Sequence, residues 1–155
     1  MTQFIDGKFT DRVRLDISPI RLDIGCGNCT KAGCIGMDKI DFGQEILWDL
    51  DNDIPLPDNS VEYIYSSHFV EHLDQRQIEN LFVEMSRVLK DKGIIEVRCP
   101  HDKTIIKYYT SHFSEWNMDR VKGIVQGWSY GNGTFTIEEL REDVNELFFK
   151  LTFHK

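Results

Sequence analysis

Short apolar runs recur through the first hundred residues, and each is followed by glycine or by polar residues. They occupy Ile20–Ile24, Cys34–Met37, Glu45–Trp48, Val61–Tyr65 and Ile94–Val97. Within a run the apolar residues follow one another almost continuously instead of alternating with polar ones, which is typical of strands covered on both faces. The pattern therefore predicts a mainly parallel sheet.

One amphipathic helix is predicted between the last two runs. Its apolar residues recur at intervals of three and four and form one stripe, namely Ile78, Leu81, Phe82, Met85, Val88 and Leu89. Asp74 and Gln77 are spaced as a capping box at its start, and Gly93 is expected to end it as a C-cap. Strands joined by such a helix indicate an α/β fold, in which ligands bind beyond the carboxyl ends of the strands.

The chain is expected to form one domain over residues 1–155. Residues 1–19 are interpreted as an N-terminal arm with a hairpin turn at Asp6-Gly7. Residues 20–101 form the core of the predicted sheet, and residues 102–155 supply loops and the terminal elements.

The terminal elements are predicted to be a helix and a strand. The helix is expected over Ile137–Leu147, because Thr136 and Glu139 are spaced as a second capping box. The strand is expected at Phe148–Phe153, which is apolar and aromatic.

Composition narrows the class of protein. With 41% hydrophobic and 28% charged residues the chain is globular. Its net charge of -8, without a cluster of Lys and Arg, argues against a nucleic-acid partner. It contains neither a membrane-length apolar run nor the apolar segment of a signal peptide, so no membrane partner and a cytoplasmic location are expected.

Four cysteines are present: Cys26, Cys29, Cys34 and Cys99. In a cytoplasmic protein they are expected to be reduced. Cys26 and Cys29 have the spacing of a redox or metal site, but the second pair that a structural zinc site needs is missing. Plain packing is favoured, and metal or redox chemistry is the alternative.

The segment LDIGCGNCT places glycines directly after the first predicted strand. Gly25 and Gly27 let the chain turn sharply and let a ligand approach the backbone. Thr30 stands where a dinucleotide motif has its third glycine, and Asp38 comes 13 residues after Gly25 instead of about 20. A nucleoside without phosphates fits better, with Asp38 for the ribose hydroxyls and Asp49 for the adenine amino group.

Four blocks of sequence, LDIGCG, IGMDK, WDLDNDIPLPDNSVEYIYSSHFVEHL and RVLKDKGIIEVRCPH, together resemble the class I S-adenosylmethionine-dependent methyltransferases over residues 20–101. The resemblance implies a Rossmann-like, doubly wound and mostly parallel sheet of about five to seven strands. It also implies S-adenosylmethionine as cofactor and a small-molecule substrate.

The resemblance further implies roles for matched positions. Asp23 and Gly25–Gly27 would face the methionine part of the cofactor, Asp38 the ribose, and Asp49 with Leu50 the adenine. The expected cofactor-binding residues are Asp23, Gly25, Cys26, Gly27, Asp38, Lys39, Asp49, Leu50, Ser66, Ser67 and His68. Structural alternatives are that Asp38 ends a strand, that Asp49 lies on a solvated face, and that Asp23 caps a backbone amide.

The chain departs from the family pattern between its first two strands. Only seven residues separate Gly27 from Ile35, whereas a crossover that contains a helix takes about ten or more. The first crossover helix is therefore expected to be truncated. The helical cap usual at the N-terminus is also missing, so the substrate site is expected to be open or completed by another subunit in a homo-oligomer.

The string SSHFVEH, residues 66–72, matches the H-x-x-E-H motif of inverted zinc proteases. A zinc hydrolase using His68, Glu71 and His72 is therefore one alternative. Within the predicted fold, however, the string is the turn after the fourth strand. We expect His68 near the reacting methyl group and Glu71 with His72 bracing nearby loops, and we assign no metal ligand.

The function expected from the sequence is methyl transfer to a small-molecule or saccharide acceptor. His68 and His101 are the candidate catalytic bases, because histidine can exchange a proton near neutral pH. A methyltransferase-like module that binds the cofactor without turnover is the alternative. The sequence does not identify the acceptor.

Overall fold

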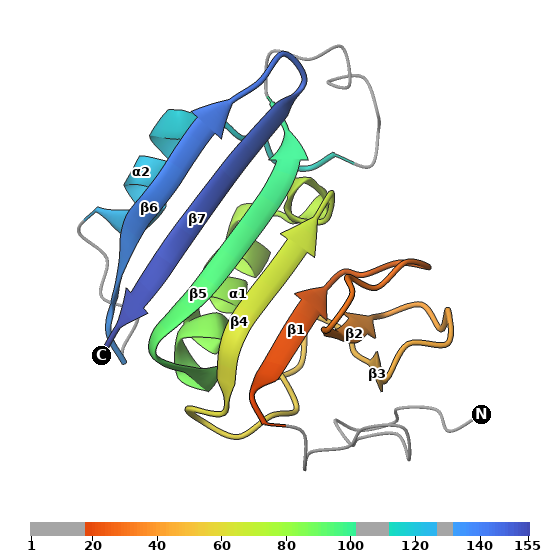
Figure 1. Ribbon diagram of the computed structural model, residues 1–155. Helices are drawn as coiled ribbons and strands as arrows, with labels where there is room; N and C mark the ends of the chain where they lie inside the picture. Colours follow the sequence, from red (N-terminus) through yellow and green to blue (C-terminus); the bar gives the residue numbers. More distant parts are fainter. Residues whose placement is uncertain (1–17, 102–111, 127–131) are drawn as a thin grey trace.

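The sheet predicted by the apolar runs is present and has seven strands (Figure 1). The computed structural model describes residues 18–101, 112–126 and 132–155. The strands are β1 (Ile20–Ile24), β2 (Ile35–Asp38), β3 (Ile46–Leu47), β4 (Val61–Ser67), β5 (Leu89–Pro100), β6 (Thr134–Glu142) and β7 (Glu146–His154). Their order is β3-β2-β1-β4-β5-β7-β6, in which β1 to β5 are parallel and β7 is antiparallel to both neighbours. The predicted Rossmann-like fold class is confirmed.

The amphipathic helix is present as α1 (Gln75–Val88), preceded by the 3-10 helix η1 (Val70–His72). The capping box is confirmed, because Gln77 N–H donates to the Asp74 carboxylate at 2.8 Å and the Gln77 side chain accepts from Asp74 N–H at 3.1 Å. The predicted end at Gly93 is wrong. Leu89 is already strand and pairs with Val61, and the extra residues 90–93 form an irregular loop in β5 before Ile94 pairs with Tyr63.

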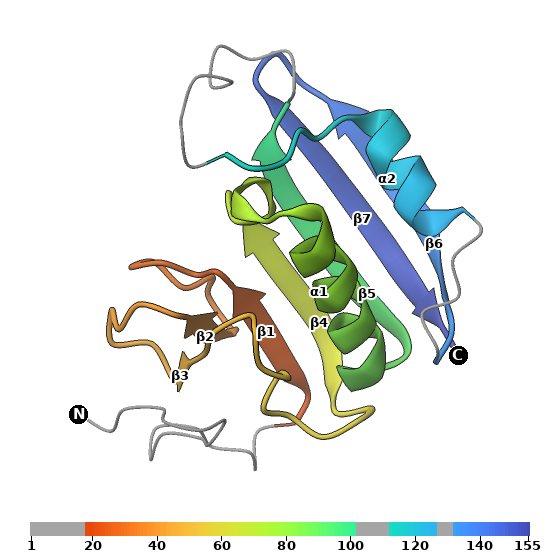
Figure 2. The same ribbon diagram turned by 180° about the vertical axis from the view of Figure 1, so that it is seen from behind.

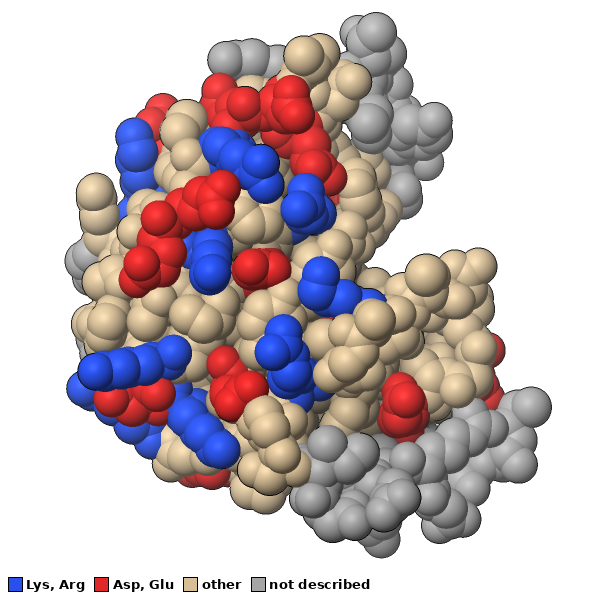
Figure 3. All heavy atoms as spheres, viewed as in Figure 1, with Lys and Arg blue, Asp and Glu red and all other residues tan. Residues whose placement is uncertain are grey.

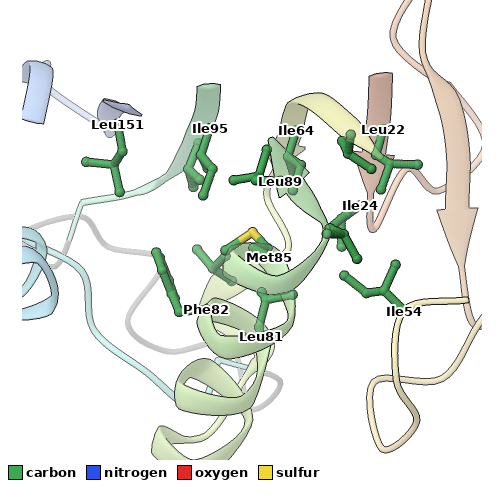
Figure 4. Close-up of a cluster of buried hydrophobic side chains, with 14 of the residues drawn as sticks. Leu22, Ile24, Ile54, Ile64, Leu81, Phe82, Met85, Leu89, Ile95 and Leu151 are labelled. Carbon is green, nitrogen blue, oxygen red and sulfur yellow. The ribbon is translucent and has the colours of Figure 1, made fainter. Parts of the chain in front are cut away.

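The hydrophobic core lies between the helices and one face of the sheet (Figure 4). Leu81, Phe82 and Met85 of α1 point toward the sheet. They meet side chains of four strands and of the loop after β3, labelled Leu22, Ile24, Ile64, Ile95, Leu151 and Ile54. Each fully buried side chain of this size contributes about 1.5–3 kcal/mol, so the stripe on α1 is the main attachment of the helix.

The predicted helix at Ile137–Leu147 is wrong, because this segment forms β6 and the turn into β7. The register of β6 shifts between Ile137 and Glu139. As a result Ile137 and Leu140 pair with Leu151 and Phe149, which lie on one face of β7. A strand irregularity thus imitates the three-residue spacing of a helix. The strand predicted at Phe148–Phe153 is confirmed within β7.

A second helix, α2 (Met118–Val125), was not predicted. It begins at Asn117, whose side chain accepts a hydrogen bond from Arg120 N–H at 2.9 Å. Val121 is its buried residue. Met118, Ile124 and Val125, spaced with Val121 at three and four residues, pack partly buried against the core. The helix is therefore amphipathic but only eight residues long. No helix of the described residues is long and apolar enough to cross a membrane.

Both α1 and α2 lie on the same side of the sheet, and no helix of the described residues covers the other side (Figures 1 and 2). The truncated first crossover is confirmed, since residues 25–34 contain turns and no helix. The crossover runs close over β2, where Gly36 has no side chain. A Cβ at Gly36 would collide with Thr30 and Cys26 of the crossover.

Paired polar and aromatic side chains occupy the side without helices, where blue and red groups intermingle in Figure 3. The Arg21 guanidinium lies over the Tyr63 ring at 4.1 Å, and the Tyr63 hydroxyl donates to Glu96 at 2.6 Å. Arg98 and Arg141 both lie over the Phe148 ring. These contacts cover the aromatic rings of a sheet face that is usually covered by helices.

The predicted N-terminal arm, residues 1–19, is described only from residue 18 onward. Residues 1–17, with the hairpin turn expected at Asp6-Gly7, lie outside the described residues. So do residues 102–111 and 127–131, within the segment expected to carry substrate-side loops.

Arg87 fastens the end of α1 to the loop that leads into β4. Its guanidinium donates to the carbonyl oxygens of Ile54 at 2.7 Å and Leu56 at 2.9 Å. It also pairs with Glu84 at 2.7 Å and Asp58 at 2.8 Å, and its side chain is 24% exposed. One side chain thus satisfies two carbonyl groups and two carboxylates.

Arg87→Ala is therefore expected to lower the free energy of unfolding by about 2–4 kcal/mol, because several partly buried acceptors lose a charged donor. Urea denaturation measures this loss. Arg76→Ala is the matched control, since Arg76 is 66% exposed and makes a 3.5 Å surface pair with Asp51. The control should change stability by less than about 1 kcal/mol; equal losses in the two variants would contradict the assignment.

Candidate functional site

The carboxyl ends of β1, β2 and β3 are joined by backbone hydrogen bonds. Gly25 N–H donates to the Met37 carbonyl oxygen at 2.8 Å, and Trp48 N–H donates to the Asp38 carbonyl oxygen at 2.8 Å. These bonds bring the glycine turn, the end of β2 and the end of β3 to one edge of the sheet. The three predicted segments therefore meet, although 22 residues separate Gly25 from Trp48.

A cavity of about 330 Å³ lies at this edge. Five of the predicted cofactor-binding residues line it: Gly25, Asp38, Lys39, Asp49 and Leu50. Aromatic and apolar walls come from Trp48, Phe69, Leu73 and Phe113, and His72 and Gln77 add polar groups. Figure 3 shows the molecule hollowed beside the β1–β3 region. Carboxylates beside an apolar slot suit a flat, polar-edged ligand such as a nucleoside.

A second hollow lies on the other side of Gly25. Asp23, Cys26 and Ser67 line it, together with residues of the shortened crossover. Gly25 thus borders both spaces. Eight of the eleven predicted cofactor-binding residues are therefore divided between two adjoining spaces, and Gly27, Ser66 and His68 line neither.

Gly25 has two reasons to be glycine. Its φ of +69° lies in the left-handed region, which other residues enter at a cost of about 1–2 kcal/mol. A Cβ at this position would also collide with the ring of Phe69. The Phe69 ring therefore covers the glycine turn where the two spaces adjoin.

The Asp38 carboxylate, at the end of β2, accepts hydrogen bonds from two backbone amides. One carboxylate oxygen accepts from Gly27 N–H at 3.0 Å, and the other accepts from Ile40 N–H at 3.1 Å. The carboxylate is thereby held at the cavity, with lone pairs left for a ligand. The Gly27–Asp38 hydrogen bond thus connects the turn after β1 with the end of β2.

Asp23 caps a backbone amide, which was its structural alternative. Its Oδ2 accepts a hydrogen bond from Lys31 N–H at 2.7 Å. The residue is 2% exposed, and this burial raises the pKa of its carboxyl, while Lys31 opposes the shift. The acid therefore closes the shortened crossover and also borders the second hollow.

Asp49 lies on an exposed loop, and its Oδ1 accepts from Asp51 N–H at 3.1 Å. The structure agrees in this respect with the solvated-face alternative. Asp49 and Leu50 nevertheless line the cavity next to Trp48. Trp48 is held by its indole N–H, which donates to the carbonyl oxygens of Asn52 and Asp53.

Ser66, His68 and His101 lie at or just beyond the ends of β4 and β5. Ser66 is buried, and its Oγ has no hydrogen-bond partner among the described residues. His68 is exposed and has a φ of +52°. It lies 3.6 Å from Glu71 and 3.5 Å from Glu146. His101 is buried 2.8 Å from Glu142. Neither candidate base is among the described residues lining the two spaces, so both roles stay predictions.

The string SSHFVEH spans the end of β4, a turn and η1. His68 and His72 therefore do not share the face of one continuous helix, as the inverted zinc-protease motif requires. Glu71 is 2% exposed, and burial raises the pKa of its carboxyl, opposed by His72 and His68. Its carbonyl oxygen accepts from Phe113 N–H at 2.8 Å and Ser114 N–H at 3.1 Å, so Glu71 does brace a loop.

All four cysteines are free thiols. Burial raises the pKa of Cys26 to about 11, so its thiol is protonated at neutral pH. A protonated thiol is a poor nucleophile and a poor metal ligand. Cys26 packs against the Gly36 position of β2, which agrees with the packing role that was favoured.

Known proteins share the fold of this chain. Residues 43–97 match the family model of a methyltransferase domain. Similar solved structures include S-adenosylmethionine-dependent methyltransferases from Archaeoglobus fulgidus, Aquifex aeolicus and Mesorhizobium loti, with TM-scores of 0.63, 0.64 and 0.60. The chain has the class I methyltransferase fold. Their sequence identities to this chain are 19%, 16% and 15%, in the same order. Each alignment covers 86% of this chain, and the alignments cover 86%, 81% and 90% of the respective solved chains. No curated protein matches the chain.

The resemblance stated from the four sequence blocks is thus confirmed in its fold, and the family match covers residues 43–97. Several residues that line this cavity were missed: Met37, Trp48, Phe69, His72, Leu73, Gln77 and Phe113. Met37, Trp48 and Phe69 adjoin predicted residues along the chain and could have been included on that ground. Phe113 could not, because it follows η1 by 41 residues and reaches the cavity only through its contact with Glu71.

Gly25→Ala is expected to destabilise the protein by about 2 kcal/mol or more and to abolish binding of S-adenosylmethionine, because strain adds to the collision with Phe69. Gly33→Ala is the matched control. Its φ is +80°, but nothing lies within 4 Å of an added Cβ. Denaturation and calorimetric titration measure both variants; equal losses in the two would show that strain alone matters at Gly25.

The free energy of unfolding of Asp23→Asn, relative to that of the unsubstituted chain, is expected to increase as the pH rises. The raised pKa of folded Asp23 means that the folded chain holds this proton more tightly than the unfolded chain does. Its stabilising effect is complete below the unfolded pKa of about 3.9 and is lost as the pH passes the folded pKa. Thermal unfolding between pH 3 and pH 7 measures the difference, and a stability difference independent of pH would contradict it.

Proposed function

We propose that this protein transfers a methyl group from S-adenosylmethionine to a small-molecule or saccharide acceptor. The observation that carries the proposal is the meeting of Gly25, Asp38 and Asp49 in one cavity of a methyltransferase fold. A glycine turn, a carboxylate for ribose hydroxyls and a carboxylate for an adenine amino group are what an adenosyl ligand needs. The cytoplasmic location and the lack of a nucleic-acid partner stay predictions from the sequence.

The chain's residues fit the cofactor in the following way. Asp38, held by Gly27 N–H and Ile40 N–H, accepts hydrogen bonds from the ribose. Trp48 and Leu50 form apolar walls for the adenine, and Asp49 accepts from its amino group. Asp23 supplies a negative charge for the ammonium group of the methionine part. A cation at Asp23 would offset the unfavourable burial that raises the pKa of this acid.

The cofactor, when bound, supplies a methyl group already activated on sulfur. The protein's task is then alignment, since placing two reactants correctly is worth about 7–11 kcal/mol. His68 stands at the end of β4 with Glu71 and Glu146 at 3.5–3.6 Å, a position from which it can take a proton from an acceptor hydroxyl.

The second candidate is a module that binds the cofactor without turnover. The Phe69 ring over Gly25 favours it, because the ring occupies the junction that an extended ligand must pass. Calorimetric titration with S-adenosylmethionine and its demethylated product tests binding. Transfer of a labelled methyl group to a panel of hydroxylated small molecules and sugars then tests turnover. Binding without transfer would support the module, and no binding would exclude both functions.

Asp38→Asn is expected to weaken binding of S-adenosylmethionine by about 10- to 100-fold, because a hydrogen bond to a charged group contributes about 1.5–3 kcal/mol. Asp41→Asn is the control, since Asp41 also ends a turn by accepting from Gly43 N–H at 2.9 Å but does not line the cavity. Calorimetric titration gives both affinities. Unchanged affinity in Asp38→Asn would contradict the ribose role.

A further inference from the structure

Two histidines and a glutamate meet beside the cavity, from segments far apart along the chain. Glu71 and His72 lie in η1, and His112 lies in the segment that returns to it. One ligand atom from each of the three side chains lies within 4.8 Å of the other two. The rings of His72 and His112 meet edge to face, with centroids 5.0 Å apart.

The returning segment is held firmly against η1. Phe113 N–H and Ser114 N–H both donate to the Glu71 carbonyl oxygen, and Ser114 Oγ donates to the Val70 carbonyl oxygen at 3.0 Å. The indole N–H of the fully buried Trp116 donates to Ser114 Oγ at 3.0 Å. His112 is therefore positioned by its neighbours, and its approach to Glu71 is a consequence of the fold.

The side chain of Glu71 is a buried carboxylate with one oxygen left without a hydrogen bond among the described residues. Its side chain is 3% exposed, and its Oε2 has no hydrogen-bond partner among the described residues. Its Oε1 lies 3.6 Å from His68 Nδ1 and 3.8 Å from His72 Nε2, both too long for a hydrogen bond. A buried carboxylate is normally paired, hydrogen-bonded or bound to a metal ion, because an isolated buried charge is strongly unfavourable.

We propose that Glu71, His72 and His112 bind a divalent transition-metal ion of the zinc type. Two imidazoles and one carboxylate are a donor set of catalytic zinc sites, which keep a further position for water or substrate. Ligand atoms about 2.0–2.2 Å from zinc lie about 3–3.5 Å apart, so the three side chains close slightly on the ion. His72 and Phe113, the neighbour of His112, also line the cavity, so the metal site and the cavity share a wall.

This ligand set differs from the set that the H-x-x-E-H motif names. The motif takes His68, Glu71 and His72, whereas the structure replaces His68 by His112. His68 precedes η1 with a φ of +52° and lies between Glu71 and Glu146. The two sets share two residues, so the third residue distinguishes them. The metal site does not depend on methyl transfer, and its failure would leave the proposed function untouched.

The test uses the full chain without a histidine tag, stripped of metal by chelator. Zn²⁺ is titrated in competition with a chromophoric chelator, and Co²⁺ absorption reports the coordination geometry. One equivalent of tightly bound Zn²⁺ is expected. His112→Asn should weaken binding by more than about 100-fold, since even residues that only orient a ligand account for 10- to 100-fold. Thermal unfolding of the metal-free variant checks that it is folded.

Two matched variants complete the test. His68→Asn is expected to bind Zn²⁺ as the unsubstituted chain does, and so is His154→Asn, whose ring contacts Thr136 far from the site in the sequence. Loss of binding in His68→Asn with retention in His112→Asn would assign the ion to the protease-type set and overturn the proposal. Failure of the unsubstituted chain to bind one equivalent, or equal weakening in all three variants, would overturn it as well.

Discussion

Two backbone hydrogen bonds hold the site together, from Gly25 N–H to the Met37 carbonyl oxygen and from Trp48 N–H to that of Asp38. They connect the ends of β1, β2 and β3 after the regular strand pairing has stopped. The first requires the left-handed conformation of Gly25, because only glycine adopts it without strain and leaves room for the Phe69 ring. The positions of Asp38 and Asp49 at the cavity follow from these bonds.

The first crossover shows how a short chain retains this arrangement. Usual class I architecture covers both faces of the sheet with helices, and the crossovers on either side of β2 would supply one of the two layers. Here the crossover is reduced to a loop that passes over Gly36 and is closed by the bond from Lys31 N–H to buried Asp23. Arginine–aromatic contacts and ion pairs cover the exposed sheet face, including Arg21 over Tyr63. Among the described residues no helix covers this face, yet the strand ends keep their places.

The cavity has two walls of different origin. The sheet wall carries the acids and the glycine turn, and it is built from residues close together along the chain. The opposite wall is built from η1 and the segment around Phe113, which are joined through the carbonyl oxygen of Glu71. That second wall contains the histidines and the buried carboxylate for which we propose a metal ion. The residues proposed to bind the cofactor and those proposed to bind the metal ion therefore lie on different walls of one cleft.

The sequence by itself determined the features that depend on neighbouring residues. The apolar runs predicted β1 to β5, the pair Asp74 and Gln77 predicted the start of α1, and the short spacing before Ile35 predicted the truncated crossover. These succeed because local periodicity and capping act within a few residues. Only the tertiary structure decided that Leu89 leaves α1 to pair with Val61, and that Ile137 and Leu140 share a strand face through an irregular register. Only it brought His112 to Glu71, because contacts across about 40 residues are formed by packing and leave no periodic trace in the chain.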